Sequence, residues 1–449
     1  MKYDYVIVGL GNTGLSCAKH LARLNFTFAI TDSRDAPPGL DEFTSLFPDA
    51  PLALGQFDQA MMLSAKELVV SQGVSYQHPT LINCQQAGIP LIGDLELFVR
   101  YVKAPIIAIT GSNGKSTVTT LVGEMLVAAG KSVKVGGNLG IPALDLISSI
   151  EPDYYVLEVS NFQLEMTTDL HAEVACVLNI SPDHLDRYAT FNDYILTKQR
   201  VYFGCKKAVI NRDDKLTALP SHNKAEVVSF GSDTPAENQF GLIKADDGQT
   251  YLTCGKEKLL DVNQLKIKGR HNWLNALSAL AIASQASVPL APLLDVLKTF
   301  AGLSHRCQWV REINGVDWYN DSKGTNIGAT IAAIAGLGSA IQGKIILLAG
   351  GLGKGADFTE LQPVVRQFVR HVILFGQDAA LISQGLGDDV SKIFARDFNE
   401  AINQAAQLSV SGDTVLLSPA CASWDMFKNF EHRGQVFCEL VRNLSTEVM

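Results

Sequence analysis

IIAITGSNGKST, residues 106–117, joins an apolar run rich in β-branched residues to a glycine-rich turn and a Lys-Ser-Thr triplet. In such a turn the backbone N–H groups point inward, the following helix N-terminus adds positive potential, and the lysine supplies a mobile charge. The pattern predicts a strand, a triphosphate-binding loop and a helix. Because Ile109 stands where the longer motif has its first glycine, the loop has the shorter form T-G-x-x-G-K-[ST]. The residues predicted to bind ATP are Gly111, Ser112, Asn113, Gly114, Lys115, Ser116 and Thr117, with a hydroxyl of Ser116 or Thr117 offered to Mg²⁺.

Apolar runs enter glycine-rich turns at two other places, residues 5–11 and residues 345–353. Continuous apolar strands followed by helical patterns are typical of parallel α/β sheets that are covered on both faces. A chain of 449 residues is also too long for one hydrophobic core. We therefore predict three α/β domains, at residues 1–93, 94–301 and 302–449, with a helical stretch from Asn272 to Thr299 before the last boundary.

Composition excludes several classes of protein. With 47% hydrophobic and 18% charged residues the chain is neither disordered nor fibrous, and its formal charge of −9 argues against a nucleic-acid scaffold. Its eight cysteines form no Cys-x-x-Cys pair, so we expect small buried side chains in a reducing compartment, with no disulfide framework or metal knuckle. No signal-peptide pattern and no apolar run of membrane-spanning length is present, so we expect a cytoplasmic protein without membrane insertion.

The first glycine-rich turn matches a dinucleotide-binding fingerprint. Gly9, Gly11 and Gly14 follow a predicted strand, and Asp32 ends the next one. Taken alone, this pattern would favour a nicotinamide dehydrogenase. However, a hydride-transfer enzyme has no use for an ATP-type loop about a hundred residues later, and such a turn binds any pyrophosphate. At this point NAD and another diphosphate ligand, such as a UDP-sugar, both stay open.

Three polar side chains stand out in the middle of the chain. Glu158 ends a predicted strand, and His184 follows another; both strand ends are expected above the phosphate loop, where a Mg²⁺ ligand belongs. The alternatives are a capping or surface acid and a hydrogen-bonded loop histidine. Lys198 lies in a predicted helix and is by default a solvated surface lysine. Because an ammonium group has only donors, Lys198 could bind a metal only after conversion to an anion.

Several longer runs resemble those of one family, the Mur ligases, which build the peptide of the bacterial cell wall. The resemblance covers essentially the whole chain and is carried by these stretches: residues 108–121, GGNLG at 136–140, DHLDRY at 183–188, GRHN at 269–272, SHR at 304–306, NDSKGTN at 320–326 and SPACAS at 418–423. It implies a Rossmann-like N-terminal domain that binds the UDP-linked substrate, a P-loop ATPase-like central domain and a Rossmann-like C-terminal domain.

Within the family the chain is most similar to the members that add D-glutamate. The resemblance implies that ATP phosphorylates the carboxylate of UDP-N-acetylmuramoyl-L-alanine, and that the amine of D-glutamate attacks the acyl phosphate. Conversion to an acyl phosphate makes chemical sense, because a carboxylate is a poor acyl donor, and metal and lysine charges lower the phosphoryl-transfer barrier. The implied cofactors are ATP and Mg²⁺, the implied partners are these two small molecules, and we expect a monomer.

The resemblance also assigns roles to individual residues of this sequence. Lys115, His184 and Lys198 are the implied catalytic residues, and Ser116, Glu158, His184 and Lys198, the last as a carbamate, would place two Mg²⁺ ions. Further ATP contacts would come from Asn272, Asn275, Arg306 and Asp321. The UDP-linked substrate would bind Thr13, Ser33, Arg34, Gly73 and Asn138, and D-glutamate would bind Lys323, Thr325, Lys354, Ser423 and Phe430.

The chain departs from the expected family pattern at Gln72, Gly324, Leu352 and Trp424, so we expect details of the substrate pockets to differ from those of relatives. The nearest alternative function is another amide ligase of the same superfamily, acting on a different amino acid or acceptor. A nicotinamide dehydrogenase and a non-catalytic nucleotide-sensing module are alternatives of other classes.

Overall fold

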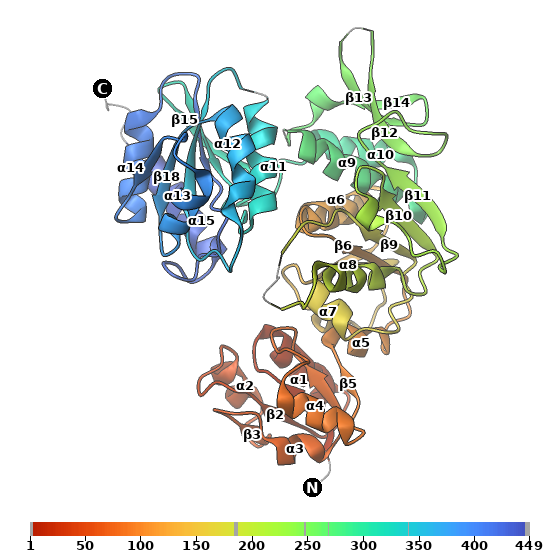
Figure 1. The fold of residues 1–449 in the computed structure, drawn as a ribbon. Helices are drawn as coiled ribbons and strands as arrows, with labels where there is room; N and C mark the ends of the chain where they lie inside the picture. Colours follow the sequence, from red (N-terminus) through yellow and green to blue (C-terminus); the bar gives the residue numbers. More distant parts are fainter. Residues whose placement is uncertain (1–2, 184–186, 247, 268, 340, 445–449) are drawn as a thin grey trace.

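The computed structural model describes residues 3–183, 187–246, 248–267, 269–339 and 341–444. Three sheets of five, nine and six strands form three α/β domains, seen one below the other two in Figure 1. The three apolar runs predicted as strands each become an interior strand of one sheet, namely β1 (Tyr3–Val8), β6 (Ile106–Thr110) and β17 (Ile345–Gly350). The predicted fold class is confirmed. The predicted boundaries at 93/94 and 301/302 fall between the sheets and stay predictions.

The N-terminal sheet has the order β3-β2-β1-β4-β5 and is parallel throughout, as a Rossmann-like half requires. Its remaining strands are β2 (Phe28–Thr31), β3 (Leu52–Ala53), β4 (Ala65–Val70) and β5 (Leu91–Ile92), and its helices are α1 (Asn12–Arg23), α2 (Leu40–Leu46), α3 (Gln59–Leu63) and α4 (Pro79–Gln86). A Cβ on Gly14 would lie 2.0 Å from the Gly9 carbonyl oxygen, so only glycine lets α1 pack this closely on the turn.

The central sheet has the order β14-β13-β12-β11-β10-β9-β6-β8-β7. Its strands besides β6 are β7 (Val133–Gly137), β8 (Tyr154–Glu158), β9 (Val174–Val177), β10 (Lys207–Asn211), β11 (Glu226–Phe230), β12 (Phe240–Lys244), β13 (Thr250–Cys254) and β14 (Glu257–Asp261). Its helices are α5 (Asp94–Val99), α6 (Lys115–Ala128), α7 (Asn161–Glu165), α8 (Phe191–Gln199), α9 (Arg270–Ala283) and α10 (Leu290–Thr299). Strand β6 lies between β8 and β9, so the phosphate loop, Glu158 and the segment after β9 meet at one edge.

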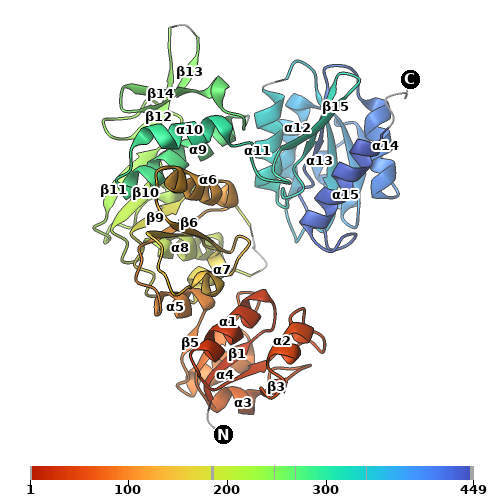
Figure 2. The same cartoon turned by 180° about the vertical axis from the view of Figure 1, so that it is seen from behind.

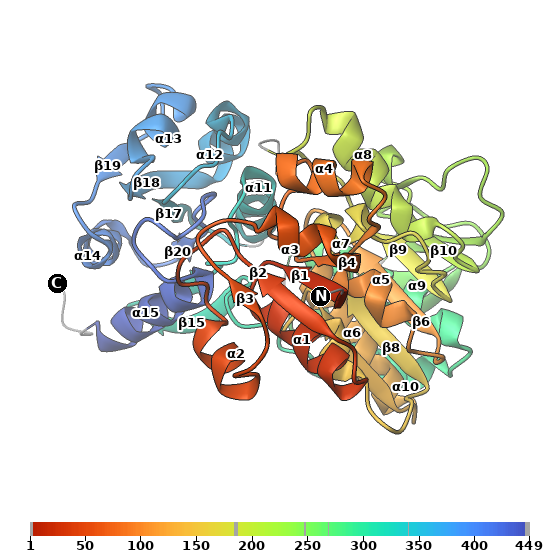
Figure 3. The ribbon, with the colours of Figure 1, turned by 90° about the horizontal axis from the view of Figure 1, so that it is seen from below.

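The C-terminal sheet has the order β15-β16-β20-β17-β18-β19. Its other strands are β15 (Gln308–Ile313), β16 (Val316–Asn320), β18 (Val369–Phe375), β19 (Lys392–Phe394) and β20 (Thr414–Leu417), and its helices are α11 (Ile327–Gly338), α12 (Gln362–Phe368), α13 (Ala379–Leu386), α14 (Phe398–Leu408) and α15 (Phe430–Asn443). Figure 2 shows α11 on the side of this domain that faces α9 of the central domain. Viewed from below in Figure 3, the N-terminal domain lies in front of the central domain, with the C-terminal domain to one side.

Two details of the sequence prediction are wrong. The central and C-terminal sheets are mixed, because β12–β14 and the β15–β16 pair run antiparallel. The β15–β16 hairpin is closed by Asn314 and Gly315, whose φ angles of 52° and 77° suit the two-residue turn that Asn-Gly favours. The predicted helical stretch 272–299 is also broken into α9 and α10, since Ser287 has a φ of 55° and Pro289 caps α10.

Candidate active site

The phosphate loop between β6 and α6 has a backbone shape that requires its glycines. Gly111 and Gly114 have φ angles of 152° and 82°, and a Cβ on Gly114 would lie 2.5 Å from Asn275 Oδ1. Lys115 begins α6, and its Nζ donates to the carbonyl oxygens of Gly111 (2.8 Å) and Ser112 (3.0 Å). The ammonium group is thus folded over the loop where a phosphate chain would lie.

Side chains from outside the motif hold this loop in place. The Asn179 side chain accepts from the Asn113 N–H (2.8 Å) and donates to the Asn113 carbonyl oxygen (3.0 Å), as a neighbouring strand would. The Ser112 and Tyr194 hydroxyls share a 2.9 Å hydrogen bond. We did not single out Asn179 or Tyr194 from the sequence. The available signals were the position of Asn179 after β9, and the four-residue spacing that places Tyr194 on the same face of α8 as Lys198.

Glu158 ends β8 beside the loop and is only 3% exposed. Its carboxylate accepts hydrogen bonds from Ser116 Oγ (2.6 Å) and Asn138 Nδ2 (2.7 Å), and Arg306 Nη2 donates to the same Ser116 hydroxyl (2.7 Å). Burial alone would raise the pKa of Glu158, but the charge of Lys115 and these hydrogen bonds outweigh it and lower the pKa. Glu158 is therefore favoured as an anion by two nearby cationic side chains, Lys115 and Arg306.

Lys198 is not a surface residue, so the default interpretation of its sequence position is wrong. It is 1% exposed, its Nζ donates to the Gly111 carbonyl oxygen (3.1 Å), and it lies 4.7 Å from the centre of the Tyr194 ring. Burial lowers the pKa of Lys198 well below its ordinary value, and the positive charge of Lys115 lowers it further. This shift favours the uncharged amine, which is the form of a lysine side chain that can add CO₂.

His184 lies outside the described residues, so its predicted role as a catalytic residue and metal ligand stays a prediction. Among the residues that are described, no three His, Cys, Asp or Glu side chains gather closely enough to hold a metal ion. The buried donors beside the loop, the Glu158 carboxylate and the Ser116 hydroxyl, are oxygen atoms, which suit a hard cation such as Mg²⁺. The chemistry of these two oxygen ligands fits the expected Mg²⁺.

A cavity of about 440 Å³ opens above the loop between the central and C-terminal domains. Both domains contribute predicted ATP contacts to its wall: Asn272 and Asn275 come from α9, and Arg306 and Asp321 come from the C-terminal domain. Burial raises the pKa of Asp321 to about 6. Of the other predicted residues, those that line the same cavity are Ser112, Asn113, Gly114, Lys115, Thr117, Asn138, Glu158, Lys323 and Thr325.

The residues predicted to bind D-glutamate are only partly brought together. Lys323 lies on the cavity wall, with its Nζ 3.7 Å from the centre of the Phe430 ring. Lys354 is linked to the cavity through Asp183, at 3.8 Å between Nζ and Oδ1. Ser423 is buried in the loop after β20 and is not among the residues described as lining this cavity.

Arg433 connects the two loops that carry these residues, and we did not predict it. Its fully buried guanidinium donates to the Ser322 hydroxyl (3.0 Å), the Ser322 carbonyl oxygen (2.8 Å) and the Cys421 carbonyl oxygen (3.1 Å). Burial lowers the pKa of Arg433 to about 10. One side chain on α15 therefore fixes the segments next to both Lys323 and Ser423.

Thr13, Ser33, Arg34 and Gly73 lie in the N-terminal domain, at the carboxyl end of its sheet and away from the cavity. Here Asp32 accepts four hydrogen bonds: from Leu10 N (2.7 Å) and from the N, Nε and Nη2 atoms of Arg34 (2.7–2.9 Å). A carboxylate offers about four acceptor positions. Asp32 is thus already satisfied, whereas a dinucleotide site needs this residue for a ribose hydroxyl.

Three family models match consecutive parts of the chain. They are the MurD-like Mur ligase N-terminal domain at residues 3–93, the Mur ligase middle domain at residues 109–283, and the Mur ligase glutamate ligase domain at residues 305–421. The chain belongs to the Mur ligase family. A relative named UDP-N-acetylmuramoylalanine–D-glutamate ligase, from Pseudomonas aeruginosa, is 51% identical over 440 residues, which cover 98% of each chain.

Solved structures of other Mur ligases and of a folate enzyme share the fold. The UDP-N-acetylmuramate–alanine ligase of Thermotoga maritima aligns with a TM-score of 0.62 at 17% identity, over 98% of this chain and 99% of its own. A bifunctional folylpolyglutamate synthase/dihydrofolate synthase of Yersinia pestis, complexed with AMPPNP and a manganese ion, aligns with a TM-score of 0.57 at 20% identity, over 77% of this chain and 92% of its own. These likenesses confirm the three-domain Mur ligase fold predicted from the sequence.

Three further findings concern the dinucleotide alternative, membrane spans and cysteines. Membership of the Mur ligase family, with Asp32 satisfied internally, removes the support for a nicotinamide dehydrogenase. Among the described residues of this Mur ligase, no helix is both long and apolar enough to cross a membrane. All eight of its cysteines are free, and six of them are buried.

Proposed function

We propose that this Mur ligase joins D-glutamate to UDP-N-acetylmuramoyl-L-alanine at the expense of ATP, in the synthesis of peptidoglycan precursors. The observation that carries the proposal is one cavity that gathers the phosphate loop, the anion Glu158 and the cation Lys323. A phosphate donor, a carboxylate acceptor and an anionic amino acid could meet there. The activity named for the Pseudomonas aeruginosa relative, 51% identical over almost the whole chain, supports the same substrates.

The reaction has two steps. First, the γ-phosphoryl group of ATP passes to a carboxylate oxygen of UDP-N-acetylmuramoyl-L-alanine, which forms an acyl phosphate and ADP. The amine of D-glutamate then attacks the acyl carbon; a C–N bond forms, the C–O bond to phosphate breaks, and a proton leaves the amine. Lys115 and Arg306 both line the cavity and would stabilise the negative charge that develops on the transferred group.

We propose Mg²⁺ as the metal, held by Ser116, Glu158, His184 and a carbamate on Lys198. Bound there, Mg²⁺ would neutralise phosphate oxygens during transfer. Ser116 and Glu158 are already joined at 2.6 Å, and the depressed pKa of Lys198 supports its conversion: the neutral amine adds CO₂ and loses a proton, leaving an anionic carbamate. The N–H groups of an ammonium cannot bind a metal ion, whereas the oxygen atoms of a carbamate can.

The substrate contacts are proposed on chemical grounds. The contacts to the UDP part surround the carboxyl end of the N-terminal sheet, where the N-terminus of α1 favours a diphosphate; they are Thr13, Ser33, Arg34 and Gly73. Asn138 donates to Glu158 and so lies nearer the reacting end of the substrate. For D-glutamate we propose Lys323, Thr325, Lys354, Ser423 and Phe430, because a dicarboxylate needs cations and donors at both ends. The cytoplasmic location and monomeric state also stay proposals.

The substrate assignment predicts a strict requirement in a phosphate-release assay. Phosphate should appear only when ATP, UDP-N-acetylmuramoyl-L-alanine and D-glutamate are all present, because the acyl phosphate needs both an acceptor and a nucleophile. A panel with L-glutamate, lysine or meso-diaminopimelate in place of D-glutamate should release none above background. Turnover with any of these three would contradict the assignment, and no release with any amino acid would favour a nucleotide-sensing module.

The acyl phosphate step has a separate test. When both carboxylate oxygens of UDP-N-acetylmuramoyl-L-alanine carry oxygen-18, the oxygen that bonds to phosphorus leaves with the phosphate. Mass spectrometry of the released phosphate should therefore find one heavy oxygen per phosphate. Unlabelled phosphate, with product formed normally, would rule out the acyl phosphate.

A further inference from the structure

The loop between β4 and α4 belongs to the N-terminal domain but is held by the central domain. It turns at Ser71–Val74, where the Val74 N–H donates to the Ser71 carbonyl oxygen (2.9 Å), and it presents the exposed Gly73. The Gln72 side chain accepts from the Ser160 hydroxyl of the central domain (2.9 Å) and donates to Thr13 (3.4 Å). The proposed contacts Thr13 and Gly73 to the UDP-linked substrate are thus tied to a residue two positions after Glu158.

Arg187 of the central domain holds the same loop from another side. Its Nη1 donates to the Gln72 carbonyl oxygen (3.1 Å), and its Nη2 donates to the Val74 carbonyl oxygen (3.3 Å). The two carbonyls flank Gly73, so the planar guanidinium is hydrogen-bonded to the backbone on both sides of that residue. A lysine, with a single nitrogen, cannot reproduce this two-point contact.

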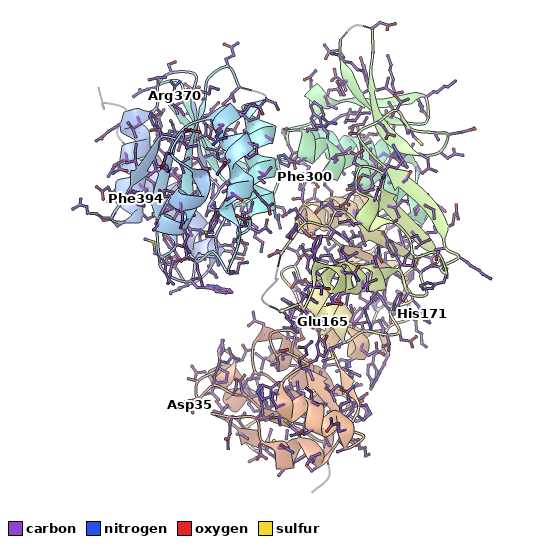
Figure 4. The ribbon with its side chains drawn as sticks, in the orientation of Figure 1. Asp35, Glu165, His171, Phe300, Arg370 and Phe394 are labelled. Atoms are coloured by element: carbon purple, nitrogen blue, oxygen red, sulfur yellow. The ribbon has the colours of Figure 1, made fainter. Side chains whose placement is uncertain are left out.

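The guanidinium is itself fixed by α7. Arg187 Nη2 forms a 2.6 Å ion pair with Glu165, and the Arg187 guanidinium carbon lies 4.2 Å from the centre of the Phe162 ring. The ion pair is largely shielded from water, since the side chains are 14% and 3% exposed, and Tyr188 donates to the other Glu165 oxygen. Figure 4 labels Glu165 at the junction between the central and N-terminal domains.

Asp183, which precedes Arg187 in the chain, contacts the cavity and the C-terminal domain. Asp183, four positions earlier, lines the cavity, accepts from Asn326 Nδ2 (3.1 Å) and lies 3.8 Å from Lys354 Nζ. Asp183 therefore contacts the C-terminal domain, and Arg187 contacts the substrate loop of the N-terminal domain.

From this geometry we infer that Arg187 is a positioning residue: it locks the Gln72–Val74 loop so that the carboxylate of the UDP-linked substrate reaches the ATP cavity. The inference rests on the proposed function. Arg187 touches no reacting atom; it acts through the backbone on either side of Gly73. Its loss should leave the ATP site intact and let the acceptor substrate bind loosely and out of line.

The test compares Arg187→Ala with Arg23→Ala, using the full-length enzyme. Arg23 is a matched control because it also joins the two domains, donating from α1 to the carbonyl oxygens of Leu144 (3.3 Å) and Ile147 (3.4 Å), but it does not touch the loop. For Arg187→Ala we expect KM for UDP-N-acetylmuramoyl-L-alanine to rise at least ~10-fold and kcat to fall at least ~10-fold, as misalignment by about 1 Å can cause. KM for ATP should change less than about twofold, and Arg187→Lys, which keeps the charge beside Glu165, should recover only part of the loss.

Equal changes in Arg23→Ala and Arg187→Ala would overturn the inference, because domain contact in general would then explain them. A rise in KM for ATP as large as that for the acceptor would also overturn it. If Arg187→Ala does not fold, as judged by circular dichroism, the same comparison is made with Arg187→Lys, and wild-type kinetics in that variant overturn the inference. Failure of the proposed function looks different, since the wild-type enzyme would then show no turnover of this substrate.

Discussion

Replacing Lys198 by alanine is expected to reduce turnover at least ~100-fold, the scale seen when one preorganised group that stabilises transition-state charge is removed. Lys198 is buried, and its Nζ sits 3.1 Å from the carbonyl oxygen of Gly111 at the start of the phosphate loop. As a carbamate it would supply anionic oxygens beside Lys115 and a metal ion. A small carboxylic acid such as formate or acetate could enter the space left by the side chain and offer similar oxygens, so we expect it to restore part of the lost activity.

The control is Lys207→Ala, because Lys207 is a partly buried lysine of the same domain whose Nζ also donates to a carbonyl oxygen, that of Gln285 at 3.0 Å, but outside the cavity. It should keep wild-type activity and gain nothing from added acid. Phosphate release is measured across a formate and acetate series, with circular dichroism to confirm folding. Folded Lys198→Ala protein that no acid activates would weaken the carbamate, and near wild-type activity without acid would rule it out.

Glu158→Gln is expected to lower kcat by at least ~100-fold and to raise the Mg²⁺ concentration needed for half-maximal rate at least ~10-fold. The substitution keeps the shape of a side chain that is 3% exposed but removes its charge. A neutral amide is a weaker ligand for a hard cation. It also removes the buried negative charge that favours the cationic forms of Lys115 and Arg306. Excess Mg²⁺ should restore only part of the rate.

Glu173→Gln provides the comparison, since Glu173 belongs to the same domain but forms an ion pair with Lys206 on the surface. Exposed pairs of this kind contribute about 0–1 kcal/mol, so this variant should behave as wild type. The measurement is initial rate against Mg²⁺ concentration at saturating ATP. An unchanged Mg²⁺ dependence in folded Glu158→Gln would show that this carboxylate does not hold the metal.

Much of the candidate site follows rules that a sequence can carry. The strand, glycine turn and lysine of residues 106–117 are adjacent in the chain, so their geometry is local and their prediction required no tertiary information. Glu158 was predicted because carboxyl ends of neighbouring parallel strands share one edge, and β8 does pair with β6. Lys198 shows where this reasoning ends: its helix is recognisable from the sequence, but its burial depends on packing of α8 against the loop.

Other features depend on contacts between distant segments. Arg433 joins the Lys323 and Ser423 loops from more than a hundred positions beyond Lys323, and it bonds mostly to backbone carbonyls, which every residue possesses. Because any residue can accept such a hydrogen bond, the partner residues cannot be identified from their side chains in the sequence. The β15–β16 hairpin is a different case, because Asn314-Gly315 is a local turn signal that is present in the sequence itself.

The sequence by itself determined the α/β class, the three strand–turn starts, the phosphate loop and the resemblance to Mur ligases, because each rests on neighbouring residues or on runs of fixed spacing. The tertiary structure alone decided that Lys198 is buried and can be an uncharged amine, that Asp32 is already satisfied by Leu10 and Arg34, and that Arg187 grips the loop around Gly73. The physical reason is the same in all three cases. Burial and hydrogen-bond satisfaction depend on which groups surround a side chain, and those groups are brought there only when the domains pack.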